Sequence, residues 1–518
     1  MSFKINIHTC FVTEEKRRIL PRSSTKNQLH EALANERFEE ASKLIASMSE
    51  AHLVECFESV DGCLKSCLHV IAAMSDTEEA TKLCRQLMQK IKNALNREYL
   101  LYTRTVDEFH IGTWKVRARV AAIHMAAYSG NSGLVRLLCQ ECGVDVNCST
   151  SETLEEPKKG ITALEWAARK GHVELVKVLL DNKVNVNVSR PTDGVTPLYI
   201  AAQEGHVKVV KLLIDNKADV NASKANGATP LFMAAQKGHV EVVKLLLDNK
   251  ADVNVSAHSN GATPLFVAAQ REQVEVVKLL LDSKAEVNAR CTDSYTALLY
   301  AAQRGFVEVV KLLLGNKADV NVSRPSDGAT PLFMAAQKGH VEVVKLLLDN
   351  KADVNVSAHS NGATSLFVAA QNGHLKVVKL LLDNKADVNA GRLSDGATSL
   401  YIEAGEGHVE VVKLLLDNKA DVNVSVSSDG DTPLFMAAAK GHVEVVKLLL
   451  DNKAYVNVRA SSDNATSLFM AAQNGHVEVM KLLLANKANV NARLKRFGEK
   501  PIDAARRNGH LDIVKLLQ

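Results

Sequence analysis

The stretch from Gly227 to Asn254 reads GATPLFMAAQKGHVEVVKLLLDNKADVN, and edited copies of it run from about residue 161 to the last residue. The threonine at position 229 recurs every 33 or 34 residues, in ten copies from Thr162 to Thr466, and Lys500 takes the same position in the final copy. A fixed period of this length is typical of a solenoid, in which structural repeats stack along one direction. The repeat therefore predicts the fold more directly than length or composition does.

Each copy predicts two short helices followed by an extended finger. Thr229 is the predicted N-cap of a first helix over Pro230–Lys237, because its side-chain oxygen can accept from a backbone N–H one turn later. The Gly-His pair at 238–239 ends that helix, and a second helix rich in Val and Leu covers about 240–248. Residues 249–261 leave the helix and end in an Asn-Gly turn. Two such short helices cannot bury their apolar stripes alone, so stacking on neighbours is obligatory.

The repeated phrases Thr-Pro-Leu, Ala-Ala, Gly-His and Ala-Asp-Val-Asn, in this order and period, resemble the ankyrin repeat over about residues 120–518. The resemblance implies an all-α fold, an ankyrin-repeat solenoid of helix-turn-helix units with β-hairpin-like fingers. Two departures stand out. The His that usually follows Thr-Pro-Leu is Phe, Tyr or Leu in most copies, and the usual Gly after the second helix is Lys. Either that Lys or the preceding Asn must then adopt a left-handed backbone, which Asn tolerates better.

The domain organisation follows from where the repeat is clear. Residues 1–24 are predicted to be a disordered tail, and residues 120–518 an array of about 12 repeats that includes a C-terminal cap. Residues 25–119 are predicted to be a helical region with two degenerate repeats and an insertion at about 93–119. For that insertion we favour a longer helix packed on the stack over an exposed partner-binding element. A second insertion, 149–159, is predicted to be a solvated loop.

Composition argues against several classes of function. A net charge of +4 over 518 residues, without a polybasic tract, does not indicate a nucleic-acid surface. No apolar run is long enough for a signal peptide or a membrane span. Eight of the nine Cys lie between Cys10 and Cys148 without regular spacing, which favours a reduced, intracellular and cytoplasmic protein. We expect a monomer with protein partners, no bound nucleic acid and no membrane insertion.

Catalytic and metal-binding chemistry is not predicted. Cys139 and Cys142 lie near Cys148, but no further ligand completes a zinc site at the required spacing. We therefore expect no metal, no cofactor and no enzymatic activity, since the histidines also lack a repeated acid or nucleophile partner. Nine of the seventeen His occupy the Gly-His corner, a structural position: His172, His206, His239, His340, His374, His408, His442, His476 and His510.

Binding specificity is expected where the copies differ, at the finger tips and at one variable position of the first helix. These candidate partner-binding residues are Arg190, Lys224, Met233, His258, Tyr300, Arg324, Met334, His359, Arg392, Met436 and Met470. An exposed stripe of Met and Tyr flanked by Arg is suited to protein recognition. The alternative, that the apolar members only fill space between repeats, is left open. Substituting Tyr300, Met334 and Arg324 together separates the two, because loss of stability would place them in the core.

Two copies break the template. Glu403 takes the position of the first Ala, where burial of an unpaired carboxylate is expected to create a soft point between the repeats of Thr364 and Thr432. Glu272-Gln273 replaces Gly-His and is expected to be a milder break.

The predicted function is a non-catalytic protein–protein interaction module, an intracellular scaffold or adaptor that binds partners on the concave face of an ankyrin array. The alternative is a substrate-recognition or targeting subunit of an enzyme complex, which docks through the N-terminal region. Fold alone does not choose between them, since ankyrin arrays bind many unrelated partners.

Overall fold

The computed structural model describes residues 32, 37–47, 78–90, 105–111, 114–120, 122–140, 144–149, 160–257, 260–291, 293–358, 361–392, 394–426, 430–495 and 498–518. The chain forms two compact units, Met1–Val267 and Ala268–Gln518, which are taken in turn. The predicted tail at 1–24 lies outside the described residues, as do residues 150–159 of the second insertion.

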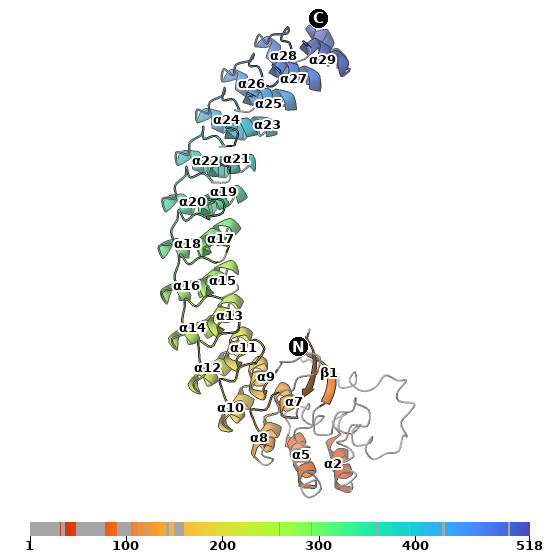
Figure 1. The fold of residues 1–518 in the computed structure, drawn as a ribbon, viewed down its shortest axis with the longest axis vertical. Helices are drawn as coiled ribbons and strands as arrows, with labels where there is room; N and C mark the ends of the chain where they lie inside the picture. The colour runs from red at the N-terminus through yellow and green to blue at the C-terminus, as the bar shows by residue number, and fades with distance from the viewer. Residues whose placement is uncertain are drawn as a thin grey trace, which may run out of the picture. The chain divides into compact units, whose positions relative to one another are not determined.

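The first unit contains a hairpin and two columns of helices (Figure 1). First helices pack on first helices and second helices on second helices, and the second-helix column continues through α5 to α2. The elements are α2 (Phe38–Ser47), α5 (Glu78–Lys90), β1 (Thr105–Ile111), β2 (Trp114–Val120), α7 (Ala122–Ser129), α8 (Ser132–Gln140), α9 (Ala163–Lys170), α10 (Val173–Asp181), α11 (Pro197–Glu204), α12 (Val207–Asp215), α13 (Pro230–Lys237) and α14 (Val240–Asp248).

The second unit repeats the same two columns, and α15 (Pro264–Gln270) contains the boundary between the units. Its elements are α16 (Val274–Asp282), α17 (Ala297–Arg304), α18 (Val307–Gly315), α19 (Pro331–Lys338), α20 (Val341–Asp349), α21 (Ser365–Gln371), α22 (Leu375–Asp383), α23 (Ser399–Glu406), α24 (Val409–Asp417), α25 (Pro433–Lys440), α26 (Val443–Asp451), α27 (Ser467–Asn474), α28 (Val477–Ala485), α29 (Pro501–Arg507) and α30 (Leu511–Leu517).

The local signals of the repeat are confirmed. Thr229 Oγ1 accepts from the backbone N–H of Phe232 at 3.2 Å, and Gly238 adopts a left-handed φ of 77° at the end of α13. The fingers are hairpin-like, as at Arg324, whose backbone N–H donates to the Ala329 carbonyl at 3.0 Å. The Ala-Ala pair of the first helix is fully buried, which lets neighbouring helices approach closely. The solenoid predicted from the period is therefore the fold.

Corner histidines join most repeats of the array to the one before, although Gln273 and Phe306 take this position in two repeats. In eight of the nine corners that have His, ring Nε2 lies 2.9–3.2 Å from a backbone carbonyl oxygen near the end of the first helix of the preceding repeat. The ring N–H therefore donates across the contact between two successive repeats, which we call the joint. The predicted structural role of the Gly-His corner is confirmed at these positions. His408 is the exception and is treated below.

A second set of contacts runs along the fingers. At six places among the described residues, the last Asn of an Asp-Val-Asn motif, or of its Asn-Val-Asn and Glu-Val-Asn variants, accepts through Oδ1 the backbone N–H of an Asp in the next repeat. For example, Asn221 Oδ1 lies 2.8 Å from the backbone nitrogen of Asp252. Two neighbouring repeats can therefore be linked by two hydrogen bonds, one from the corner histidine and one at the base of the finger.

The left-handed residue after the second helix is Lys, and the preference for Asn was wrong. Ten lysines from Lys183 to Lys487 have φ between 59° and 69°. The preceding Asn stays at negative φ, as Asn249 does at −98°, because its side-chain amide then donates to the helix carbonyl four residues earlier. That bond, 2.8 Å from Asn249 Nδ2 to the Leu245 oxygen, is lost if Asn takes the left-handed position instead.

The insertion at about 93–119 also differs from the favoured prediction. Strands β1 and β2 form an antiparallel hairpin in which Thr105 pairs with Val120 and Ile111 with Trp114. Residues 114–120 read WKVRARV, an alternation of apolar and polar residues with a period of two, which indicates a strand. The predicted helix is therefore wrong for residues 105–111 and 114–119. Whether the hairpin binds a partner stays a prediction.

Glu272 is another non-glycine residue in a left-handed conformation: its φ is 56°, at the corner position where other repeats have Gly. Glu272→Gly is expected to raise the stability of the array by about 1 kcal/mol, because glycine adopts this conformation without a side-chain clash. Urea unfolding followed by circular dichroism measures the shift. The control Glu275→Gly, in the exposed first turn of α16, is expected to lower stability by about 1 kcal/mol. A stabilisation by both substitutions, or by neither, would contradict the assignment of strain to Glu272.

Candidate functional site

The candidate binding face is built from the first helices and the finger tips. Arg324 and Arg392 hold the same position in their fingers, and each pairs with the Asp three residues later. The Nε atom of Arg324 lies 2.9 Å from Asp327 Oδ1, and that of Arg392 lies 2.9 Å from Asp395 Oδ1. The guanidinium beside each carboxyl holds the pKa of both Asp residues below the usual value.

Each of these arginines also lies over an aromatic ring, which belongs to the preceding finger for Arg324 and to the same repeat for Arg392. The Arg324 guanidinium lies 5.0 Å from the centre of the Tyr295 ring, and that of Arg392 lies 5.6 Å from the Phe367 ring. A cation over an aromatic face is attracted by the ring quadrupole. Both arginine side chains are about one-quarter exposed, so most of their surface contacts the protein and only a part is open to solvent.

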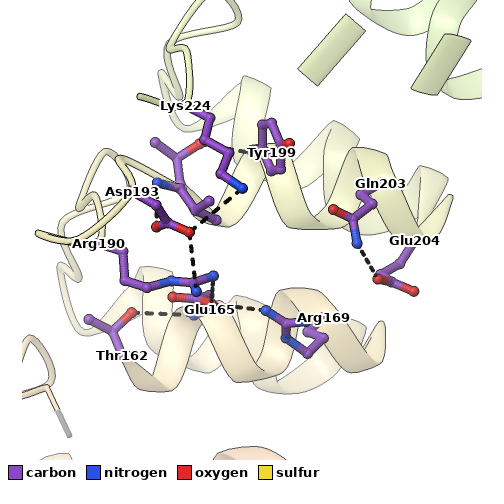
Figure 2. A network of polar contacts seen from close by, with 11 residues as sticks. Thr162, Glu165, Arg169, Arg190, Asp193, Tyr199, Gln203, Glu204 and Lys224 are labelled. Atoms are coloured by element: carbon purple, nitrogen blue, oxygen red, sulfur yellow. Dashed lines mark hydrogen bonds and ion pairs between the residues drawn. The ribbon is translucent and has the colours of Figure 1, made fainter. Parts of the chain in front are cut away.

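Arg190, the third arginine of this kind, binds a buried carboxylate (Figure 2). Glu165 of α9 is only 4% exposed, and its Oε1 lies 3.0 Å from Arg190 Nη2 and 3.2 Å from Arg169 Nη2. Burial raises the pKa of the Glu165 carboxyl, while Arg190 and Arg169 oppose that rise. Two cations of the same repeat, one on helix α9 and one on the finger that follows α10, therefore compensate one buried anion.

The network continues to the next finger. Asp193 Oδ2 lies 3.5 Å from Arg190 Nη1 and 3.9 Å from Lys224 Nζ, and Figure 2 shows Asp193 between these two cations. Tyr199 lies alongside, and burial together with the Asp193 charge raises its pKa to about 12. Lys224, a predicted binding residue, is thus part of a polar chain that links helix α9 to two successive fingers.

Aromatic rings lie beside the same network. Tyr128 and Trp166 make an edge-to-face contact with centroids 5.4 Å apart. Arg169 lies 5.8 Å from the Trp166 centroid, and Lys170 Nζ lies 4.6 Å from that of Tyr128. The sequence analysis missed this cluster. The sequence feature that could have predicted it is Glu165, which occupies a position where most repeats have Phe, Tyr or Leu.

The variable first-helix position divides into buried and partly exposed members. Met334 is 3% exposed and packs with Leu299, Val322 and Ala329, so in that repeat the space-filling alternative holds. Met334 therefore does not belong to an exposed stripe. The residues that remain partly exposed at this position are Met233, Tyr300, Ile402, Met436 and Met470. The predicted His258 and His359 lie outside the described residues.

Three of these residues occur in consecutive repeats and form what we call the apolar strip: Ile402 of α23, Met436 of α25 and Met470 of α27. Three positions after the variable residue, seven repeats have Gln, but α23 has Gly405 and α25 has Ala439. A Cβ added at Gly405 would lie 3.3 Å from Met436 Cε, so the Met436 side chain lies over the space that glycine leaves. Two of the three repeats of the strip, those of α23 and α25, therefore lack the amide side chain found elsewhere in the row.

The described residues offer neither a metal site nor a membrane span. No group of three or more His, Cys, Asp or Glu in those ranges could hold a metal ion. Cys139 and Cys148 are partly buried and form no disulfide, and Cys142 lies outside the described residues. None of the described helices is long and apolar enough to cross a membrane.

Arg190→Ala is expected to destabilise the array by about 2–3 kcal/mol, because it removes one of two cations from a buried carboxylate. The loss should shrink at low pH, since Glu165 is then protonated and needs no cation. Thermal unfolding at several pH values measures both effects. Arg392→Ala is the matched control in the same finger position, and loss of its more exposed pair is expected to cost about 1 kcal/mol or less. Equal losses for the two variants would contradict a special role for Glu165.

Comparison with known protein families agrees with the geometry. A family model described as ankyrin repeats (3 copies) matches residues 104–190, 123–224, 164–257, 217–291, 298–392 and 391–460, and one described as ankyrin repeats (many copies) matches residues 456–518. No curated protein matches the sequence. Ankyrin repeats are in general protein–protein interaction modules, and they imply protein partners. The chain belongs to the ankyrin-repeat family.

Proposed function

We propose that this protein is a non-catalytic scaffold or adaptor that holds partner proteins against the face made by its first helices and fingers. The observation that carries the proposal is the apolar strip of Ile402, Met436 and Met470, which is partly exposed in three consecutive repeats. Scattered apolar residues are normal on a surface, but a contiguous row is typical of an interaction site. Methionine suits such a site because its flexible thioether adapts to different partner surfaces.

The rest of the face supports the same function. Arg392, in the finger that leads into α23, is fixed by its Asp395 and Phe367 contacts, so a partner on the strip would meet a preorganised cation at the finger before it. The small net charge gives no reason to prefer nucleic acid as the ligand. The irregular cysteines favour an intracellular location for this scaffold.

The double variant Met436→Lys with Met470→Lys is expected to reduce partner capture about tenfold or more, because two charges are placed where a partner would bury apolar surface. Quantitative crosslinking and mass spectrometry in native lysate measures the capture. The control, Glu410→Gln with Glu444→Gln, adds the same net charge on the exposed second helices α24 and α26 and should leave capture unchanged.

Crosslink positions decide between the two functions. Partners crosslinked to α23–α27 and lost in the methionine variant support the scaffold. An unchanged partner set with crosslinks confined to residues 25–119 would contradict it and support the enzyme-targeting alternative.

A further inference from the structure

The joint between the repeat of α21 and α22 and the repeat of α23 and α24 differs from its neighbours. His408 sits at the corner that should bond across this joint, but its Nδ1 atom lies 2.8 Å from Glu403 Oε2 within its own repeat. The corresponding acceptor, the Gln371 carbonyl oxygen, receives no hydrogen bond from His408. At the next joint, by contrast, His442 Nε2 lies 3.0 Å from the Gly405 carbonyl oxygen.

The position of the ring shows the same displacement. In the eight corners that keep the cross-joint bond, a Cβ added to the preceding corner glycine would lie 2.6–2.9 Å from the histidine ring. For Gly373, which faces His408, the distance is 3.5 Å. The His408 ring has therefore moved away from the preceding repeat. The eight other corners serve as internal references for this shift, because they share the same local sequence pattern.

Glu403 is the cause of the displacement. It is fully buried in the position where the other first helices have Ala, so its carboxyl group has no access to water. The expectation of an unpaired carboxylate was wrong, because His408 is a partner, but Oε1 has no hydrogen-bond partner among the described residues. A buried ionised carboxylate with one bond is costly and attracts any available donor.

The charges around Glu403 are few. Burial raises the pKa of the Glu403 carboxyl to about 7, His408 acts to lower it, and Glu406 on the same helix acts to raise it. Helix α21, which packs on one side, has no titratable residue. The remaining charged or titratable groups on the packed elements and adjoining corners are Tyr401 of α23, Glu410, Lys413 and Asp417 of α24, Lys440 of α25, and the corner residues His374 and His442.

We propose that Glu403 and His408 form a pH-dependent latch on this joint, in which ionised Glu403 holds His408 away from the Gln371 carbonyl and protonated Glu403 releases it to close the joint. The change between the two states requires only the gain or loss of one proton by the Glu403 carboxyl group. A neutral carboxyl is tolerated in the core without the histidine, and the freed ring then has the same acceptor that eight other corners use.

The direction of the pH effect follows from linkage. The folded-state pKa of Glu403 is raised to about 7 from its ordinary value of 4.5, so the folded state binds the proton more tightly than the unfolded state. The stability of this region is therefore greatest at low pH and is lost as the pH rises through about 7. The inference concerns the mechanics of the array and goes beyond the proposed function, since it holds whether or not the apolar strip binds a partner.

Hydrogen exchange of the full chain, measured at about pH 6 and about pH 8 and corrected for intrinsic rates, tests the latch. At the higher pH, amides of α21–α24 should be about tenfold less protected than those of α17–α20, whose corner residue His340 keeps its bond to the Gln303 carbonyl. At the lower pH the difference should shrink to about twofold or less. A constant difference, or none, would overturn the proposal.

Three variants isolate the titrating group. Glu403→Ala should bring the protection of α21–α24 to the level of α17–α20 at both pH values, and Glu403→Gln, which keeps a polar side chain, should remove the pH response. Glu406→Gln, an exposed change on the same helix, should retain it. A pH response that survives in Glu403→Gln would assign the effect to another group and reject the latch.

Discussion

The structure depends on the stacking of successive repeats, since two short helices have too little apolar surface to fold alone. At the corner, His239 Nε2 lies 2.9 Å from the Gln203 carbonyl oxygen of the preceding repeat. At the finger, Asn221 Oδ1 accepts the backbone N–H of Asp252. These polar bonds fix the register, while the buried Ala, Val and Leu side chains supply most of the stabilisation. The repeated His and Asn side chains, which could be taken for catalytic or ligand-binding residues in the sequence, therefore form hydrogen bonds between repeats.

Because each joint is nearly a copy of the last, a single substitution changes one joint and leaves the others as references. Glu165 converts an apolar contact into a buried carboxylate held by Arg169 and Arg190. Glu403 withdraws the corner histidine from its joint and keeps it within one repeat. Gly405 and Ala439 remove polar side chains from the row beside the apolar strip. These substitutions distinguish individual repeats from the consensus of the array, and the proposed function depends on them.

The period, the Thr caps and the Gly-His corner were enough to predict the fold, because each signal is local and is repeated at constant spacing. The left-handed Lys was not predicted, since the choice depends on a bond from the Asn249 amide to the Leu245 carbonyl that propensity does not include. The hairpin at 105–120 occurs once, so no repeat supported it, although its alternating residues were a usable signal. The burial of Met334 depends on packing with the finger residue Val322, which spacing alone cannot specify. The partner of Glu403 lies only five residues away, at the corner whose His the sequence had already identified as structural.

Where the corner keeps its histidine and the cross-joint bond, that bond couples a repeat to the one before it. Hydrogen exchange of the full chain carrying His340→Ala tests it most directly, since this residue bonds to the Gln303 carbonyl at 3.1 Å in an otherwise regular joint. The account predicts that amides of α17–α20 exchange about fivefold faster, as expected for one lost hydrogen bond, while those of α25–α28 are unchanged. Unchanged exchange in α17–α20, or an equal increase along the whole second unit, would contradict it.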